Sequence, residues 1–117
     1  MIKRPRTIIC DIDGIIFKYF GDISRVHLSK PVVLEGVRDK FKEWDIEGCH
    51  IILMTGRRES VRKETEKQLS EAGIFYDELI MGVGGGVRVL INDKKPDVED
   101  NTAIAICIER NKGMKNI

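Results

Sequence analysis

The sequence predicts a three-layer α/β fold in which helices cover a mainly parallel sheet of five strands. Two observations predict it. Short apolar runs rich in β-branched residues alternate with stretches of helical periodicity, which is the β-α-β order of parallel sheets. The runs are also apolar throughout, as in strands that are buried on both faces. With 117 residues, of which 42% are hydrophobic and 33% charged, we expect residues 1–117 to form a single globular domain.

The first part of the chain predicts a strand, a flap and a helix. Residues 6–12 form the first buried strand, and residues 15–20 could make a small extended flap before the polar segment 21–30. Gly48 ends the helix that follows. The helix is predicted from four large apolar residues at helical spacing, Leu34, Val37, Phe41 and Trp44.

The second part predicts one more helix and four strands. Residues 50–54 form a buried strand, and residues 58–72 form a helix that Gly73 ends. The inward positions of that helix are Val61, Thr65, Leu69 and Ala72. The remaining strands are predicted at 77–81, 87–91 and 103–108. We expect residues 110–117 to form a frayed tail. Helices on both faces of such a sheet give a Rossmann-like architecture.

Charge and composition argue against several classes of function. Twenty Lys and Arg residues against nineteen Asp and Glu residues give a net charge of +1, so no bulk charge draws the chain to nucleic acid or to a membrane surface. No apolar run approaches the roughly 20 residues that span a bilayer, and the first residues lack the apolar core of a signal peptide. Cys10, Cys49 and Cys107 are scattered, which is typical of reduced thiols. We therefore expect a cytoplasmic protein.

The first candidate site closes the first strand with Asp11, Asp13 and Gly14. Side chains alternate along an extended chain, so two acids two residues apart point the same way. One of them can attack or bind a metal while the other handles protons. The alternative interpretation is a turn in which the acids and the glycine serve only the backbone.

Two further candidates close later strands. Thr55, Gly56 and Arg57 follow the strand at 50–54, where a hydroxyl, backbone N–H groups and a guanidinium could bind the phosphate of a substrate. Thr55 could instead cap the next helix, and Arg57 could lie in its solvated first turn. Asp93 follows the strand at 87–91 and could add an oxygen to a Mg²⁺ site, although an Asn-Asp turn explains it too. All three candidates lie at carboxyl ends of strands in one sheet, so folding is expected to bring them together.

This pattern resembles the haloacid dehalogenase-like (HAD) phosphohydrolase superfamily. The resemblance lies in three motifs, Asp11-x-Asp13-Gly14, Thr55 and Asn92-Asp93, whose order and spacing match over residues 6–109. The small size is similar to that of the compact, capless members of the sugar-phosphate and capsule-biosynthesis type. About twenty residues separate the first strand from the first helix, too few for a separate cap domain.

The resemblance implies a mechanism and a cofactor. Asp11 would be the nucleophile that forms an aspartyl-phosphate, and Asp13 the general acid and then the general base. Thr55 would hold a phosphoryl oxygen. Mg²⁺ would be bound by Asp11, Asp13 through its backbone carbonyl, and Asp93, with Asn92 as an open question. The implied activity is Mg²⁺-dependent hydrolysis of a phosphomonoester.

Two departures from the family pattern bear on activity. Members usually carry Thr after the glycine of the first motif, where this chain has Ile15. The basic residue that orients nucleophile and phosphate commonly lies in the loop before the fourth strand, which is glycine-rich here at 82–86. Arg88 is the nearest basic residue, followed by Lys94 and Lys95, so we assign the role to Arg88 or Lys94. Reduced activity is consistent with these departures.

A site without a cap domain is exposed to solvent, and the sequence does not identify its substrate or a partner that closes it. We expect a small phosphorylated metabolite such as a sugar phosphate, with the site closed by a second copy of the chain at the apolar flap 15–20. One alternative is a HAD-like domain that binds a phosphorylated ligand without turnover. Others are a phosphatase acting on nucleic-acid ends, which the neutral charge argues against, and a receiver domain, whose acids are adjacent rather than two residues apart.

Overall fold

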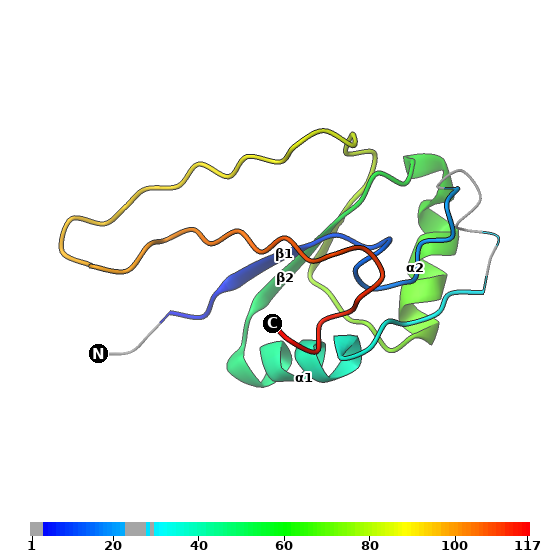
Figure 1. The fold of residues 1–117 in the computed structure, drawn as a ribbon, viewed down its shortest axis with the longest axis horizontal. Helices are drawn as coiled ribbons and strands as arrows, with labels where there is room; N and C mark the ends of the chain where they lie inside the picture. Colours follow the sequence, from blue (N-terminus) through cyan, green and yellow to red (C-terminus); the bar gives the residue numbers. More distant parts are fainter. Residues whose placement is uncertain (1–3, 23–27, 29) are drawn as a thin grey trace.

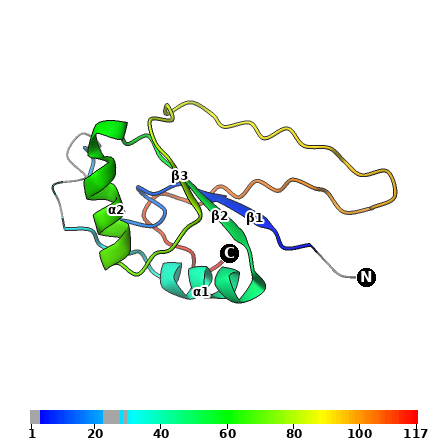
Figure 2. The same cartoon turned by 180° about the vertical axis from the view of Figure 1, so that it is seen from behind.

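The computed structural model describes residues 4–22, 28 and 30–117, and it is an α/β structure with a parallel sheet (Figure 1, Figure 2). Its elements are, in chain order, β1 (Thr7–Cys10), α1 (Val37–Glu47), β2 (His50–Met54), the 3₁₀ turn η2 (Glu59–Val61), α2 (Arg62–Glu71) and β3 (Glu78–Ile80). The strands are ordered β1-β2-β3, and both pairs are parallel. The predicted β-α-β-α-β order is confirmed for this part of the chain.

Both helices cover the same face of the sheet. Successive parallel strands that step in one direction through right-handed crossovers place their helices on one side. Ile51 and Leu53 of β2 accordingly share one buried cluster with Phe41 of α1 and Leu69 of α2. On the other face Ile9 remains 47% exposed. The described elements therefore form two layers, and the expected third layer is not among them.

The first helix follows the sequence prediction closely. Val37, Phe41 and Trp44 are its buried residues, and the Phe41 and Trp44 rings meet edge to face with centroids 5.0 Å apart. Gly48 ends the helix in a left-handed conformation with φ of 78°. In the second helix the buried residues are Thr65, Gln68 and Leu69, and the preceding residues form η2 rather than helix.

The C-terminal segment packs on the core, so the expectation of a frayed tail at 110–117 is wrong. Met114 is 1% exposed, and its N–H donates to the Glu35 carbonyl at 2.8 Å. Gly113 has φ of 81°, and a Cβ atom there would collide with the Glu35 carbonyl oxygen. The apolar Met114 side chain thus draws the chain end against the residues that precede α1.

The flap at 15–20 is only partly buried in the core. Ile16 and Phe17 are buried, and the Ile16 carbonyl accepts from the Leu34 N–H at 2.9 Å. Ile16 and Phe17 therefore do not face solvent, whereas Phe20 of the same flap is 57% exposed, and the contact with a second copy stays a prediction. The polar segment 21–30 lies largely outside the described residues.

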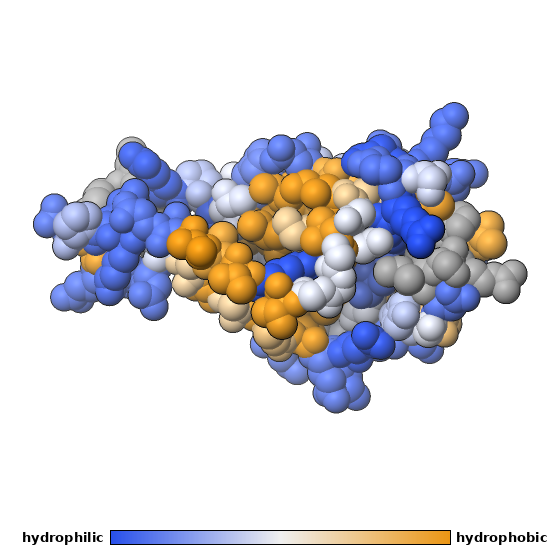
Figure 3. Space-filling view, turned by 90° about the horizontal axis from the view of Figure 1, so that it is seen from above, coloured by the Kyte–Doolittle hydropathy of each residue, from blue (hydrophilic) through white to orange (hydrophobic). Residues whose placement is uncertain are grey.

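Residues 84–107 form a long extended arm instead of completing the sheet (Figure 1). The segments predicted as strands at 87–91 and 103–108 carry no strand in the structure, and Val87 and Ile91 are 94% and 90% exposed. Figure 3 views the molecule from above, and it shows apolar side chains gathered in the middle of that face. The five-stranded sheet is therefore not seen in the described residues, because neither segment pairs with β1. No helix in the described part of the chain has the length and apolar character needed to cross a membrane.

Candidate active site

The edge where β1 and β2 end brings the first two motifs together. Cys10 pairs with Leu53 in parallel register, so Asp11 and Thr55 follow their strands at the same edge of the sheet. After Asp11 the chain turns sharply, with the N–H groups of three successive residues, 15–17, within hydrogen-bond distance of the Ile12 carbonyl. Gly14 has φ of 87°, a conformation that favours glycine.

Asp11 is half-exposed and faces a pocket. Its Oδ1 accepts from the Ile12 N–H at 2.9 Å and lies 3.7 Å from Nη1 of Arg88. Burial raises the pKa of Asp11 above its ordinary value, while the Ile12 N–H and the Arg88 charge offset part of that rise. The preferred basic residue of the sequence analysis, Arg88, is thus placed beside the preferred nucleophile.

Asp13 is held by a buried arginine. Arg57 donates from Nε to Asp13 Oδ2 at 2.9 Å and from Nη2 to Asp13 Oδ1 at 2.8 Å. Its Nη1 donates to Thr65 Oγ1 and Gln68 Oε1 of α2, at 3.2 and 2.6 Å. Arg57 is only 3% exposed. Its guanidinium therefore lies neither in a solvated helix start nor open to a substrate, and it connects Asp13 to α2.

Thr55 and Gly56 form the turn beneath the site. Thr55 is 1% exposed, and its Oγ1 accepts from the Arg57 N–H at 3.1 Å. The residue before η2 is Arg58 and the residue before α2 is Val61, and neither helix has a side-chain cap. The hydroxyl of Thr55 thus stabilises the turn before η2 and does not cap the second helix.

The third motif stays on the arm. Asp93 is exposed, and its carboxylate lies 3.9 Å from Lys95 Nζ. Lys94 is exposed as well. Within residues 4–22, 28 and 30–117, no group of three or more His, Cys, Asp or Glu residues could hold a metal. Asp93 therefore does not join Asp11 and Asp13, because the segment before it does not pair with β1.

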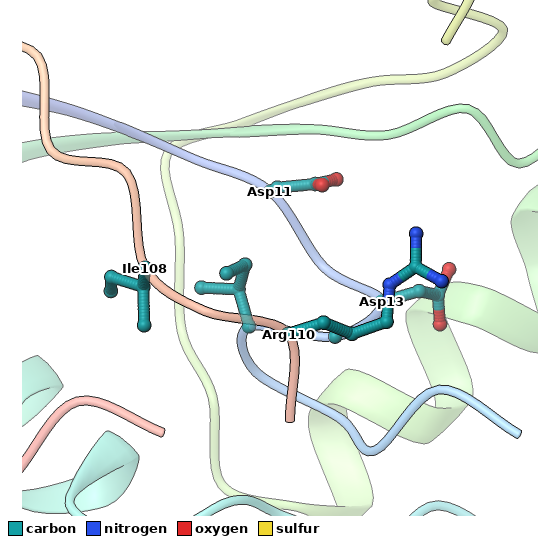
Figure 4. Close-up of a pocket in the computed structure, with 6 residues that line it drawn as sticks. Asp11, Asp13, Ile108 and Arg110 are labelled. Atoms are coloured by element: carbon teal, nitrogen blue, oxygen red, sulfur yellow. The ribbon is translucent and has the colours of Figure 1, made fainter. Parts of the chain in front are cut away.

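Both acids line a pocket of about 270 Å³ (Figure 4). Its lining residues are Asp11, Asp13, Gly14, Ile15, Ile108 and Arg110. Arg110 was not foreseen as a site residue, since no local motif surrounds it and it was expected in the tail. The residue that follows it, Asn111, has a positive φ of 65°, which is uncommon for a residue other than glycine.

Comparisons with known proteins give a partial likeness to solved structures. No protein-family model matches the chain, and no curated protein does. The chain is 28% identical to a chain in the structure of the Pnkp1/Rnl/Hen1 complex, with a TM-score of 0.60 over 73% of its own length. A second match, at 28% identity and a TM-score of 0.58, is in the structure of the Pnkp1/Rnl/Hen1 RNA repair complex. The chain spans 30% and 28% of the lengths of these two solved chains.

Proposed function

We propose that the chain is a HAD-like phosphohydrolase that cleaves phosphomonoesters with Mg²⁺. The observation that supports this most is the placement of Asp11 and Asp13 in one pocket, at the carboxyl end of β1, with Arg88 beside Asp11. A half-exposed carboxylate can attack phosphorus, and a second carboxylate in the same pocket can transfer protons.

The proposed reaction has two steps. In the first, an Asp11 oxygen forms a bond to phosphorus, the bond to the leaving oxygen breaks, and Asp13 donates a proton to the leaving alcohol. In the second, a water molecule attacks the aspartyl-phosphate, Asp13 accepts its proton, and the bond between Asp11 and phosphorus breaks to release inorganic phosphate. Arg88 would balance charge on the phosphoryl oxygens.

The donors at the pocket fit a weakly enclosed Mg²⁺ site. Mg²⁺ is often held by one or two carboxylates together with substrate phosphate oxygens and water, rather than by a cage of protein ligands. The half-exposed carboxylate of Asp11 and the backbone carbonyl of Asp13 suit such a weakly enclosed site. Asp93 remains the proposed third ligand and would have to leave its place on the arm. When bound, the ion would neutralise charge on the phosphoryl group.

The contacts of Asp13 also support a second candidate, binding of a phosphorylated ligand without turnover. Both Asp13 carboxylate oxygens accept hydrogen bonds from Arg57. Protonation of Asp13, which the first step needs, would compete with one of these bonds. A ligand-binding domain has no such requirement.

Phosphate release separates the two candidates. An aryl phosphate, a panel of sugar phosphates and RNA oligonucleotides with terminal phosphates would be tested with Mg²⁺ and with a chelator. We expect Mg²⁺-dependent turnover that Asp11→Asn lowers on the order of a thousandfold or more, while Asp45→Asn, an exposed residue of α1, leaves it unchanged. Ligand binding without release of phosphate would identify the binding domain, and turnover that persists in Asp11→Asn would refute the mechanism.

The substrate has two candidates. The capless resemblance favours a small phosphorylated metabolite, such as a sugar phosphate. The likeness to chains of an RNA repair complex favours a phosphorylated RNA end. Preferential turnover of one class in the same panel decides between them.

A further inference from the structure

Arg110 is a cation of the pocket that the proposed reaction does not use. It lines the pocket with Asp11 and Asp13, and its side chain is exposed. Within the described residues no carboxylate lies within ion-pair distance of it, whereas Arg57 is paired with Asp13 and Arg88 with Asp11. An arginine beside two acids that belongs to neither of them is available to an anion from solution.

The position of Arg110 is fixed by its neighbours. Asn111 donates its N–H to the Gly14 carbonyl at 2.8 Å, and its side chain bonds both the N–H and the carbonyl of Tyr19, at 2.7 and 3.0 Å. The Arg110 guanidinium lies over the Tyr19 ring, 4.5 Å from its centroid. The aliphatic stem passes over Gly14, where a Cβ atom would be 3.1 Å from Arg110 Cγ.

This arrangement leaves the donors of the guanidinium free. A contact of the guanidinium charge with an aromatic ring uses none of its N–H donors, so these remain available. Two parallel N–H groups match the oxygens of a phosphate or a carboxylate. The ordering of the side chain by Tyr19 lowers the entropy that binding would otherwise cost.

The geometry points to the leaving-group side of the pocket. Arg88 lies at Asp11, the proposed site of the reacting phosphoryl group. The Arg110 stem crosses Gly14, which follows Asp13, the residue proposed to protonate the leaving alcohol. An anion bound by Arg110 would therefore belong to the alcohol rather than to the phosphoryl group.

We propose that Arg110 binds a second anionic group of the substrate, so that the substrate is a phosphomonoester whose alcohol carries a further phosphate. This rests on the proposed function and narrows its substrate class. The same chemistry occurs in a sugar bisphosphate and at the end of an RNA strand, where the next phosphate follows the terminal one.

Paired substrates with one and two phosphates test the proposal. The pairs are glucose 1-phosphate with glucose 1,6-bisphosphate, and a nucleoside 3′-phosphate with its 3′,5′-bisphosphate. We expect the bisphosphate of one pair to be preferred about 10- to 100-fold in kcat/KM, the range of one or two charged hydrogen bonds. Arg110→Ala should remove this preference by raising KM for the bisphosphate, with the monophosphate unchanged, because the contact binds ground state and transition state alike.

Two further variants show whether the effect belongs to the guanidinium. Arg110→Lys should keep part of the preference, and Lys112→Ala, an exposed basic residue outside the pocket lining, should keep all of it. Equal loss for both members of a pair would assign Arg110 to the reacting phosphoryl group and overturn the proposal. No change in Arg110→Ala would overturn it as well.

Binding separates this proposal from the proposed function. Calorimetry would measure Kd for both bisphosphates with two proteins, the single variant Asp11→Asn and the double variant that also carries Arg110→Ala. If binding to Asp11→Asn weakens at least tenfold with Arg110→Ala while the unsubstituted protein releases no phosphate from any substrate of the panel, the role of Arg110 is kept and the phosphatase is refuted. Binding that does not depend on Arg110, or no binding of either bisphosphate, would overturn the role of Arg110 whatever the turnover.

Discussion

Replacing Arg57 by Met should destabilise the protein strongly. The Arg57 and Asp13 side chains are 2% and 7% exposed, and the guanidinium also donates to Thr65 and Gln68. Arg57→Met keeps an apolar stem of similar length but leaves the Asp13 carboxylate buried without its cation. Removal of one partner of a buried ion pair costs about 3–5 kcal/mol in the free energy of unfolding. Urea denaturation, followed through the single tryptophan Trp44, would measure the change.

A second replacement identifies the cause. If the cost arises from the unpaired charge, adding Asp13→Asn to Arg57→Met should recover part of the lost stability, so that the double variant is more stable than the sum of the single effects predicts. Lys67→Met is the exposed control, since the Lys67 and Glu71 side chains are 75% and 65% exposed and such pairs contribute about 0.3–0.5 kcal/mol. An effect of Arg57→Met as small as that of Lys67→Met would refute the reasoning.

Three further predictions concern a glycine, a histidine and the thiols. Gly113→Ala should lower the free energy of unfolding by about 2–4 kcal/mol in urea denaturation, because it adds a Cβ at positive φ against a backbone oxygen. The hydrogen bond that His50 Nε2 donates to the Glu78 carboxylate raises the pKa of His50, so its contribution to stability is fully present below the unfolded pKa of about 6.5 and is lost as pH rises through the folded pKa. An NMR titration should show this pKa fall in Glu78→Gln. Burial raises the pKa of Cys10 to about 12, so an aromatic disulfide reagent should modify the exposed Cys107 in the folded protein and Cys10 only in denaturant.

Each of these has a result that would contradict it. Gly85→Ala, where a Cβ meets no atom within 4 Å, is the matched control, and an equal loss of stability in both variants would remove the steric argument. An unchanged His50 titration in Glu78→Gln would show that the hydrogen bond is absent in solution. Protection of Cys107 from the reagent would show that the arm is covered.

The sequence predicts the elements whose signal is local. The spacing of Leu34, Val37, Phe41 and Trp44 predicts which face of the first helix is buried, and the last three are the buried residues of α1. Leu34 precedes α1 and packs partly buried against the core. The placement of Asp11 at the end of β1 follows from the same local pattern. Arg57 shows the limit, because its burial depends on Asp13, which is 44 positions away in the sequence. Arg57 and Arg58 follow Thr55 and Gly56 directly, and nothing in this local sequence shows which guanidinium is buried and which is solvated.

The arm shows the same limit for strands. The apolar, β-branched run at 87–91 has the composition of a buried strand, but a strand also needs an edge with free hydrogen-bonding groups. Among the described strands the outer edge of β1 offers such groups, so whether the run pairs there is decided by how the whole chain packs and not by the run alone. In the structure the run lies exposed, and the residue predicted as the third metal ligand, Asp93, remains with it. The unpaired run and the distance of Asp93 from the other acids therefore have one cause.

The charge of the pocket differs from the charge of the whole chain, and this bears on the choice of substrate. Asp13 is neutralised by Arg57 and Asp11 faces Arg88, so Arg110 leaves the surroundings of the pocket with more cationic than anionic groups. A net charge of +1 argues against binding along the length of a nucleic acid, where affinity comes from many phosphates. It does not argue against binding one end through one or two phosphates. For an RNA substrate, the slope of log K against log salt should then be about −1, since each neutralised phosphate on a single strand contributes roughly −0.7. A slope of about −4 or steeper would show contacts along the strand, which the described surface does not explain.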